Sequence, residues 1–457
     1  MNQLLIKGGK YVSGRNIVKA DILVDEGKIA AIGPNLSTSA EQVIDAHDKL
    51  ILPGGVDVHV HLPWPTGSHI STDTINTGTR AAAFGGVTSV IDFAIPQENE
   101  SLSTALQAKI DEARSNTWVD YSFHLNIRGE TNSKISEIPD LVAAGLPSFK
   151  IFMAYEGFRL EDRRLLEVLA AVAKANGIVS VHAENGALAD HITLGLLENG
   201  KKAISDYAFA RPSICEEEAI SRLLIYQKVA GARLHIHHVS TAGGVKQIGQ
   251  ARRAGRSVSA ETCPHYLVFT DQDYSRSPAS AAALICAPSI KSANDQAALW
   301  QALSSGILSA VATDHCPYTQ AQKEQNLDDF SKIPGGMAGI ETRLPLLFSE
   351  GVLKGRLSLE RFSQVWAEEP TRIFGLFPRK GQISVGSDAD LVIFNPAEKW
   401  TLRAADLHMN TDCLPYEGME VTGKAETTIL RGNIIIQDGR QKQSSPNGQL
   451  IPRSFAK

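Results

Sequence analysis

Residues 53–62, with the sequence PGGVDVHVHL, decide how this chain is interpreted. The stretch joins an apolar, β-branched run to two histidines that are one residue apart. Side chains at positions i and i+2 of a strand point to the same face of a sheet, so His59 and His61 could place two imidazoles on one metal ion. A His-x-His pair also occurs where a strand simply runs into a loop, so its meaning depends on the rest of the chain.

The composition narrows the class of protein. The chain has 457 residues, 43% of them hydrophobic, and a formal net charge of −5. A large core is therefore possible, and no clustered excess of Lys and Arg suggests a nucleic-acid partner. No apolar run of about 18 residues and no leader-like N-terminus are found, so we expect no membrane span and a cytoplasmic location. Five scattered cysteines fit reduced thiols rather than a disulfide framework.

Both ends of the chain consist of short β-like runs separated by turns. These runs cover residues 4–6, 21–24 and 28–32 near the N-terminus and residues 391–394, 428–430 and 432–436 near the C-terminus. They read as antiparallel strands, and we expect residues 1–52 and 378–440 to form one small β-sandwich together. Residues 441–457 are rich in Ser, Pro, Gly and Gln, which predicts a poorly packed tail or an arm on a neighbouring subunit.

The central part, residues 53–377, has a different pattern. Segments of helical composition, such as 165–175 and 216–229, separate several apolar strand-like runs. The runs cover residues 56–61, 87–94, 119–127, 148–153, 178–184, 233–240, 257–263 and 308–314. Eight strands with crossover-length connections predict an α/β fold, a TIM-like (β/α)8 barrel, whose reactive groups lie at the C-terminal ends of the strands.

Side chains that can bind metal lie at the ends of these predicted strands and not at their starts. They are His59 and His61 on the first strand, Lys150 on the fourth, His182 on the fifth, His238 on the sixth and Asp314 on the eighth. On the sixth strand, His238 alternates with His237. Because apolar layers usually fill a barrel, we expect the set that contains Leu234, Ile236 and His238 to face inward, and His237 to be no ligand.

Lys150 is unusual because it interrupts the apolar run SFKIFM at residues 148–153. Burial lowers the pKa of a lysine, and a neutral amine can react with carbon dioxide to give a carbamate. A carbamate is an anion with two oxygen atoms that could bridge two divalent cations. Alternatively, Lys150 could extend to solvent at the strand end or pair with a carboxylate.

Taken together, these motifs resemble the hydantoinase and dihydropyrimidinase family of cyclic amidohydrolases, within the amidohydrolase superfamily. The resemblance covers nearly the whole chain, and the order and separation of the segments make coincidence a poor explanation. The matching segments are 53–62, 77–86 (TGTRAAAFGG), 148–155 (SFKIFMAY), 181–185 (VHAEN), 238–240 (HVS), 261–266 (ETCPHY), 313–316 (TDHC) and 339–343 (GIETR).

The resemblance implies a centre with two divalent metal ions. One ion would be held by His59, His61 and Asp314, and the other by His182 and His238. A carboxylated Lys150 and a hydroxide would bridge the two ions. Zinc suits imidazole and carboxylate ligands best, although manganese or cobalt is chemically acceptable. Asp314 would also take the proton of the attacking water and deliver it to the leaving nitrogen.

The resemblance also assigns substrate contacts. Tyr155 would stabilise the tetrahedral oxyanion, and backbone atoms around Cys286 and Gly335 would recognise the ring amide. Trp64, together with Phe158, would contact the exocyclic substituent. The segment at 286–291 (CAPSIK) departs from the usual Ser-Pro-Pro-Leu-Arg, and Gly335 replaces a common Asn.

We therefore expect an enzyme that opens a 5-substituted hydantoin or a dihydropyrimidine to an N-carbamoyl amino acid. An allantoinase is the alternative, supported by the Cys-Ala-Pro wording of the 286–291 segment. A non-catalytic scaffold relative would have lost several metal ligands, whereas all six are present here. A dihydroorotase would need a group dedicated to a ring carboxylate, and the sequence offers no unambiguous candidate. The resemblance suggests a homotetramer.

Overall fold

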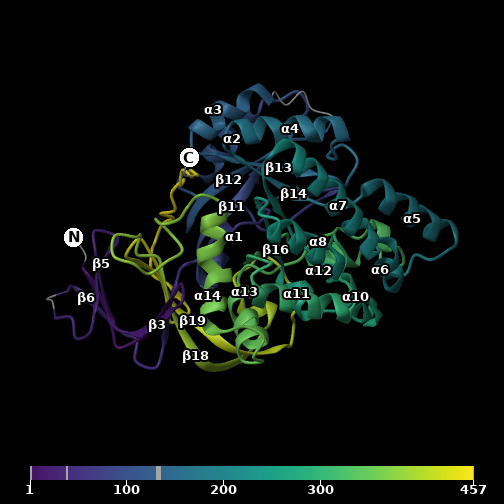
Figure 1. Ribbon diagram of the computed structural model, residues 1–457. Coiled ribbons are helices and arrows are strands. Elements are labelled where there is room, and N and C mark those ends of the chain that lie inside the picture. The colour runs from purple at the N-terminus through teal and green to yellow at the C-terminus, as the bar shows by residue number, and fades with distance from the viewer. Residues whose placement is uncertain (1–2, 38–39, 130–134, 456–457) are drawn as a thin grey trace.

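The computed structural model describes residues 3–37, 40–129 and 135–455, and within them the centre is a sheet of eight parallel strands (Figure 1). Each predicted central run overlaps one of these strands. In sheet order they are β17 (Ala310–Val311), β16 (Val258–Thr262), β15 (Arg233–Ile236), β14 (Ile178–His182), β13 (Ser148–Phe152), β12 (Asp120–Asn126), β11 (Val87–Ala94) and β8 (Gly55–Asp57). The barrel closes beyond β8 and β17, where Val60 pairs in parallel with His315 and the His61 N–H donates to the His315 carbonyl over 2.9 Å.

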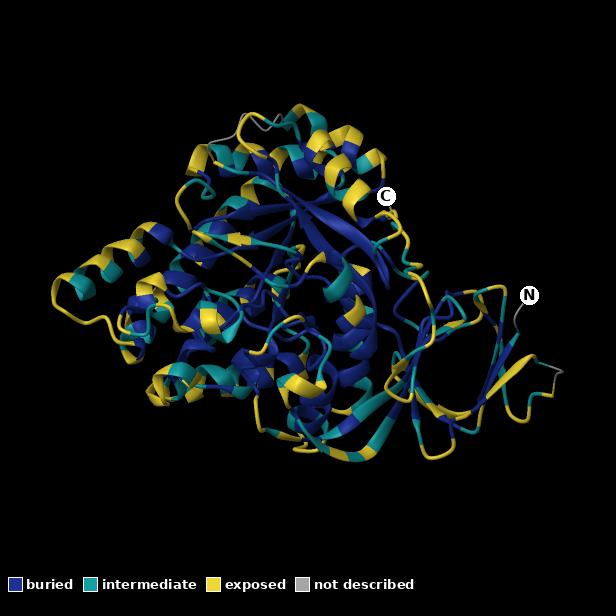
Figure 2. Cartoon of the chain, turned by 180° about the vertical axis from the view of Figure 1, so that it is seen from behind, coloured by how far each residue is buried: buried dark blue, intermediate teal, exposed yellow. Residues whose placement is uncertain are grey.

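Helices follow most of the barrel strands and cover the outside of the barrel. They are α1 (Ile75–Phe84), α2 (Leu102–Ala113), α3 (Ile138–Ala143), α4 (Asp162–Lys174), α7 (Ser213–Ala230), α8 (Ala242–Arg253) and α11 (Ala293–Ser305). On α4, Leu165, Leu169 and Val172 repeat at helical spacing and are buried. By contrast, α5 (Gly186–Glu198) projects from the barrel and is largely exposed (Figures 1 and 2). None of the described helices is both long and apolar enough to cross a bilayer.

The two ends of the chain form two further sheets beside the barrel, as expected (Figure 1). In sheet order, the larger sheet contains β21 (Arg440–Gln441), β20 (Asn433–Gln437), β19 (Glu420–Leu430), β18 (Leu391–Thr401), β7 (Leu50–Pro53), β2 (Lys10–Ser13) and β3 (Asn16–Lys19), and the smaller one contains β5 (Lys28–Gly33), β4 (Asp21–Asp25), β1 (Leu4–Lys7) and β6 (Gln42–Asp45). Within the larger sheet, N-terminal β7 pairs antiparallel with C-terminal β18, which joins the two ends. The pairing is mixed rather than purely antiparallel, because β1 pairs with β6, and β2 with β7, in parallel.

From Gly448 to Ser454 the C-terminal tail is bonded to its own barrel, which differs from the poorly packed tail or subunit arm that was expected, whereas residues 441–447 are exposed or half-buried. The Tyr121 N–H donates to the Gln449 carbonyl over 2.9 Å, and the Ile451 N–H donates back to the Tyr121 carbonyl over 2.8 Å. Arg453 is 1% exposed and donates to Ser148 Oγ over 2.7 Å. The tail therefore closes the N-terminal end of its own barrel, held by backbone bonds and one buried cation that composition does not reveal.

The inward face of β15 also differs from the expectation. His235 Nε2 and His237 Nδ1 lie 3.0 and 2.7 Å from the carboxylate of Glu261, all three residues being buried. Leu234 and Ile236 belong instead to the main hydrophobic core. The assumption of an apolar interior was wrong for this strand, because a buried carboxylate from β16 provides partners for the inward-facing imidazoles.

Candidate metal centre and active site

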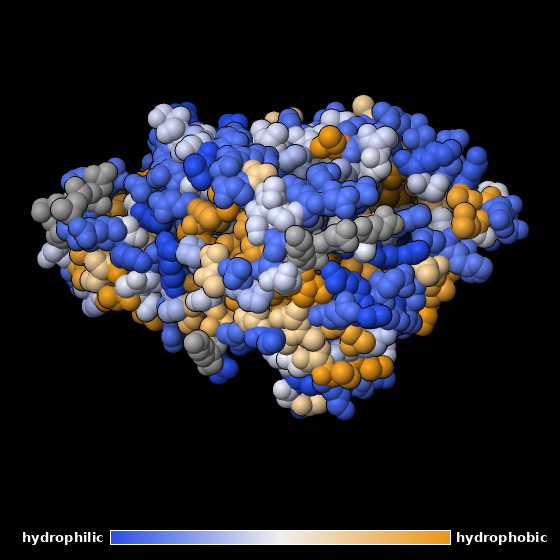
Figure 3. Space-filling view, turned by 90° about the horizontal axis from the view of Figure 1, so that it is seen from above, coloured by the Kyte–Doolittle hydropathy of each residue, from blue (hydrophilic) through white to orange (hydrophobic). Residues whose placement is uncertain are grey.

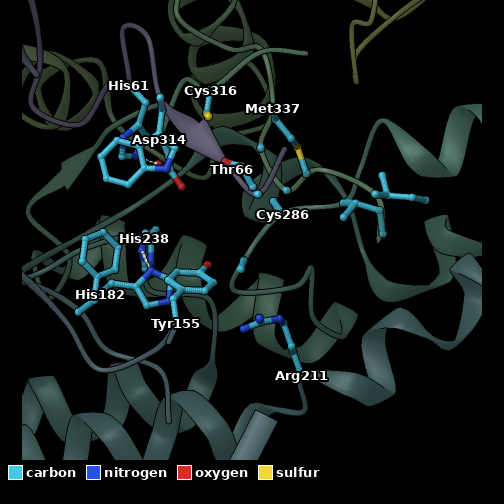
Figure 4. A pocket seen from close by; sticks show the side chains of 18 of the residues that line it. His61, Thr66, Tyr155, His182, Arg211, His238, Cys286, Asp314, Cys316 and Met337 are labelled. Carbon is cyan, nitrogen blue, oxygen red and sulfur yellow. Dashed lines mark hydrogen bonds and ion pairs between the residues drawn. The ribbon is translucent and has the colours of Figure 1, made fainter. Parts of the chain in front are cut away.

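A cavity of about 480 Å³ opens at the C-terminal ends of the barrel strands (Figure 4). Its wall contains every site residue predicted from the sequence. These are His59, His61, Trp64, Lys150, Tyr155, His182, His238, Cys286, Asp314 and Gly335. The ten residues come from widely separated parts of the chain, so the fold brings together what the sequence indicated separately.

The first group of ligand-type side chains converges on one carboxylate. His59 Nε2 and His61 Nε2 lie 3.0 and 2.9 Å from the same oxygen, Asp314 Oδ1. Asp314 follows β17 with φ of 51°, in the left-handed region that non-glycine residues seldom occupy. The strained backbone turns this carboxylate toward the two imidazoles, and the three donor atoms are close enough to hold one cation.

The second group consists of His182 at the end of β14 and His238 beyond β15. His182 Nδ1 and His238 Nε2 lie 2.8 Å apart. His238 has φ of 37°, so the chain turns sharply after His237. This turn brings His238 to the cavity while His237 stays inside the barrel. The position expected for His238 is therefore found, but a left-handed backbone explains it and simple alternation does not.

Lys150 on β13 is 1% exposed. Its Nζ lies 4.7 Å from the ring centroid of Phe152 and 5.3 Å from that of Phe93. Among the described residues, no carboxylate lies within 4.0 Å of this nitrogen, so neither exposure nor a paired carboxylate explains it. Burial lowers the pKa of Lys150 to about 7.

Two carboxylates that the sequence analysis did not single out orient the histidines. Glu261 Oε1 lies 2.7 Å from His59 Nδ1, and Glu184 Oε2 lies 3.3 Å from His182 Nε2. Arg211 forms an ion pair with Glu184. Burial raises the pKa of Glu261, but hydrogen bonds from His235 and His59 outweigh it and lower that pKa to about 2. The i+2 spacing of Glu184 from His182 was a usable signal, since both side chains then share one face.

These contacts fit a centre for two divalent ions. A carboxylate that binds one ring nitrogen of a histidine leaves the other nitrogen to bind a metal, and this arrangement leaves His59 Nε2 and His182 Nδ1 as possible ligand atoms. The buried donor set consists of imidazoles, one carboxylate and a lysine without a carboxylate partner. Such nitrogen and oxygen ligands suit zinc and neighbouring divalent metals.

Tyr155 stands beside this centre. Its φ is 67°, and its ring centroid lies 5.1 Å from that of His182. Figure 4 shows the ring beside His182 and His238. Although Tyr155 is 36% exposed, desolvation of its hydroxyl at the cavity raises the pKa of Tyr155 well above its usual value of 10. The hydroxyl therefore stays protonated and can donate a hydrogen bond.

An aromatic wall and two backbone segments complete the cavity. Trp64 lies 4.3 Å from the ring of His61 and 6.0 Å from that of Phe158, measured between centroids. Cys286 and Gly335 belong to segments that touch, because the Gly336 N–H donates to the Ile285 carbonyl over 2.9 Å. The cavity thus has a metal-type centre on one side and backbone groups on another.

Comparisons with known proteins agree with this architecture. The profile described as Amidohydrolase family matches residues 50–435. The D-hydantoinase of Geobacillus stearothermophilus is 40% identical over 454 residues, which cover 98% of this chain and 96% of that protein. The dihydropyrimidinase structure from Brevibacillus agri NCHU1002 has a TM-score of 0.97 and 38% identity and covers both chains fully. The L-hydantoinase structure from Arthrobacter aurescens has a TM-score of 0.91 and 32% identity, covering 99% of this chain and 100% of that one.

The fold, the cavity and the comparisons all identify the same family. The similarity extends over nearly the full length of this chain and of its relatives, and it includes the segments that line the cavity. The chain belongs to the amidohydrolase family and, within it, to the hydantoinase and dihydropyrimidinase group of cyclic amidohydrolases.

Proposed function

We propose that this protein hydrolyses the ring amide of a 5-substituted hydantoin or a dihydropyrimidine to give an N-carbamoyl amino acid. The observation that carries the proposal is the joint placement of six ligand-type side chains and Tyr155 around one cavity. A scaffold without activity would not need buried histidine rings that are oriented by carboxylates.

Two divalent ions, most suitably Zn²⁺, would be held in this cavity. His59, His61 and Asp314 would bind one ion, and His182 and His238 would bind the other. Lys150, as a carbamate, would bind both ions. When bound, such a pair supplies a hydroxide nucleophile at neutral pH and polarises the scissile carbonyl. The isolation of Lys150 from carboxylates supports its carboxylation, because the carbamate would replace the missing anion.

The protein's own groups would carry the proton and the oxyanion. Asp314 accepts the proton of the attacking water and passes it to the ring nitrogen, which must be protonated before the C–N bond breaks. Tyr155 donates its hydroxyl proton in a hydrogen bond to the oxyanion of the tetrahedral intermediate. Both residues line the same cavity, so one substrate position can reach them.

Substrate orientation would come from the opposite walls. Backbone groups at Cys286 and Gly335 would bind the ring amide. Backbone recognition requires no particular side chain, so it tolerates the unusual sequence of these segments. Trp64 and Phe158 would contact an exocyclic substituent at the ring carbon. An apolar, aromatic wall favours an apolar or aromatic substituent over a charged one.

A homo-oligomer, a tetramer by resemblance, is part of the proposal. Several large apolar side chains on α5, α6 (Tyr207–Ala210) and α7 are more than half exposed. They are Leu194, Phe209, Ile214, Ile225 and Val229. Figure 3 shows apolar patches on an otherwise largely hydrophilic face, and patches of this kind commonly mark subunit contacts.

The five cysteines are free and buried, which supports the proposed cytoplasmic location.

A substrate panel tests the reaction. Metal-supplemented protein is assayed on 5-phenylhydantoin, dihydrouracil, allantoin and dihydroorotate, with the N-carbamoyl product measured by chromatography. We expect turnover of the hydantoin or the dihydropyrimidine. A clear preference for allantoin would make the enzyme an allantoinase, and no turnover of any ring by metal-loaded protein would support a scaffold.

The carbamate on Lys150 has its own test. Intact-peptide mass spectrometry under mild conditions, or ¹³C NMR after incubation with labelled bicarbonate, should detect one added carboxyl group per chain. We expect Lys150→Arg to lose this signal together with bound metal. An unmodified Lys150 in an active, metal-loaded enzyme would contradict the assignment.

A further inference from the structure

Lys323 on α12 (Gln320–Glu324) lies behind the cavity wall and joins two segments of that wall. The side chain is 1% exposed, and its Nζ donates to the Ile285 carbonyl over 3.0 Å and to the Pro334 carbonyl over 2.7 Å. The two acceptors are 49 positions apart in the sequence (334 − 285). One buried ammonium therefore holds together the two segments that carry Cys286 and Gly335.

The environment of Lys323 is unfavourable for a cation. Among the described residues, no carboxylate pairs with it, and burial lowers the pKa of Lys323 to about 8. A buried charge without a counter-ion opposes folding. A contribution to stability therefore does not explain why a lysine occupies this position. A role in arranging the wall of the neighbouring cavity would explain it.

Each acceptor carbonyl belongs to the same peptide group as the N–H of a residue that lines the cavity. The Ile285 carbonyl shares a peptide group with the Cys286 N–H, and the Pro334 carbonyl shares one with the Gly335 N–H. Neither N–H forms a hydrogen bond within the part of the chain that the structure describes. Both residues line the cavity, and Figure 4 shows Cys286 beside Met337 at its wall.

A hydrogen bond to a carbonyl polarises the whole peptide group and makes its N–H a stronger donor. An ammonium does this more strongly than a neutral donor. The Ile285 carbonyl accepts twice, from Lys323 and from the Gly336 N–H over 2.9 Å, so the two segments are also fixed relative to each other.

We propose that Lys323 is a positioning residue, which sets the spacing of the Cys286 and Gly335 segments and strengthens their N–H groups as donors to the substrate. The ligand that such a pair of donors fits is a cyclic imide or ureide, whose carbonyl oxygens lie on either side of a ring nitrogen. This inference rests on the proposed function, since it assigns those two N–H groups to the ring. Lys323 itself touches no substrate.

The test compares Lys323→Met with the wild type on the substrate that wild-type enzyme turns over best. Methionine keeps the volume but removes the donor. We expect KM to rise about tenfold, the effect of losing hydrogen bonds that involve a charged group, while kcat changes little and metal content stays at the wild-type level. A KM within twofold of wild type would overturn the proposal.

A matched control separates positioning from stability. Lys380 is equally buried and donates to Asp120 and Asp390 over 2.7 and 2.5 Å, away from the cavity. Lys380→Met should lower the melting temperature and leave KM within twofold of wild type. If Lys323→Met gives the same result, Lys323 is merely structural.

A second variant protects the test against misfolding. Lys323→Gln keeps a neutral donor on a shorter chain, and we expect its KM to lie between those of the wild type and Lys323→Met. If Lys323→Met does not fold, an unchanged KM in Lys323→Gln overturns the proposal and a raised KM supports it. Failure of wild-type enzyme on every cyclic amide would instead refute the proposed function, so the two failures are distinguishable.

Discussion

His182 Nδ1 and His238 Nε2 face each other at 2.8 Å although 56 positions separate the two residues. Without a metal ion, one of the two nitrogens carries a proton and donates it to the lone pair of the other. A divalent cation can replace that shared proton if both nitrogens are unprotonated and bind it. The geometry explains why these buried histidines occur as a pair, and it leads to the first prediction.

Replacing His238 should remove one of two metal ions. We expect His238→Ala to contain about one divalent ion per chain instead of two, as measured by mass spectrometry of the elements, and kcat to fall about 10³-fold. His408→Asn changes a histidine that pairs with Glu341 outside the cavity and should keep both ions. Two ions in His238→Ala would contradict the ligand assignment.

Glu261 should control metal affinity without binding metal itself. Its Oε1 lies 2.7 Å from His59 Nδ1, so Glu261→Gln weakens the orientation of that ring. We expect a 10- to 100-fold loss of metal affinity, measured by competition with a chelator. Glu341→Gln is the matched control, because Glu341 also contacts a histidine Nδ1, that of His408, over 2.8 Å. Equal affinities for the two variants would argue against this role of Glu261.

Removal of the Tyr155 hydroxyl should slow the chemical step. For Tyr155→Phe we expect kcat to fall about 10²- to 10³-fold, because one oxyanion donor is lost. Metal content and KM should stay near wild-type values, as the ring remains in the cavity. Steady-state kinetics with parallel metal analysis check this, and a kcat within threefold of wild type would remove Tyr155 from the mechanism.

Trp64 should determine the preference for substituents. In Trp64→Ala the aromatic wall that Trp64 forms with Phe158 is lost, so we expect kcat/KM for 5-phenylhydantoin to fall about tenfold relative to unsubstituted hydantoin. The ratio of the two substrates within each enzyme corrects for any general loss of activity. An unchanged ratio would show that the substituent lies elsewhere.

Burial of Lys323 should make stability depend on pH. Its pKa is about 8 in the folded protein and 10.5 when unperturbed. Between these two pH values the unfolded chain binds more protons than the folded protein, so the free energy of unfolding rises with pH. Below pH 8 Lys323 is charged in both states, and the folded protein bears the full cost of burying that charge. Relative to Lys323→Met, wild type should gain up to roughly 3 kcal/mol of unfolding free energy from pH 8 to 10.5. Urea unfolding at both pH values measures this, and equal pH responses would contradict the lowered pKa.

Much of the fold could be predicted because it is encoded locally. The run at β11 was predicted with the bounds that the structure shows, Val87–Ala94, since a strand buried on both faces is a continuous apolar stretch. The spacing of His59 and His61 and the lysine inside an apolar run are likewise local signals. Chain order and strand ends then placed all six ligand-type residues at one end of the barrel.

Other features depend on contacts between distant segments. Glu261 contacts His59, which is 202 positions away, and Lys323 contacts Ile285, which is 38 positions away. No sequence pattern near Glu261 or Lys323 predicts these contacts. The packing of the tail depends on Arg453 reaching Ser148, 305 positions away. The sequence by itself therefore determined the barrel and the types of ligand, because periodicity and burial are local. Only the tertiary structure decided which carboxylate orients which histidine and which side chain joins the Cys286 and Gly335 segments, because these depend on distances across the folded chain.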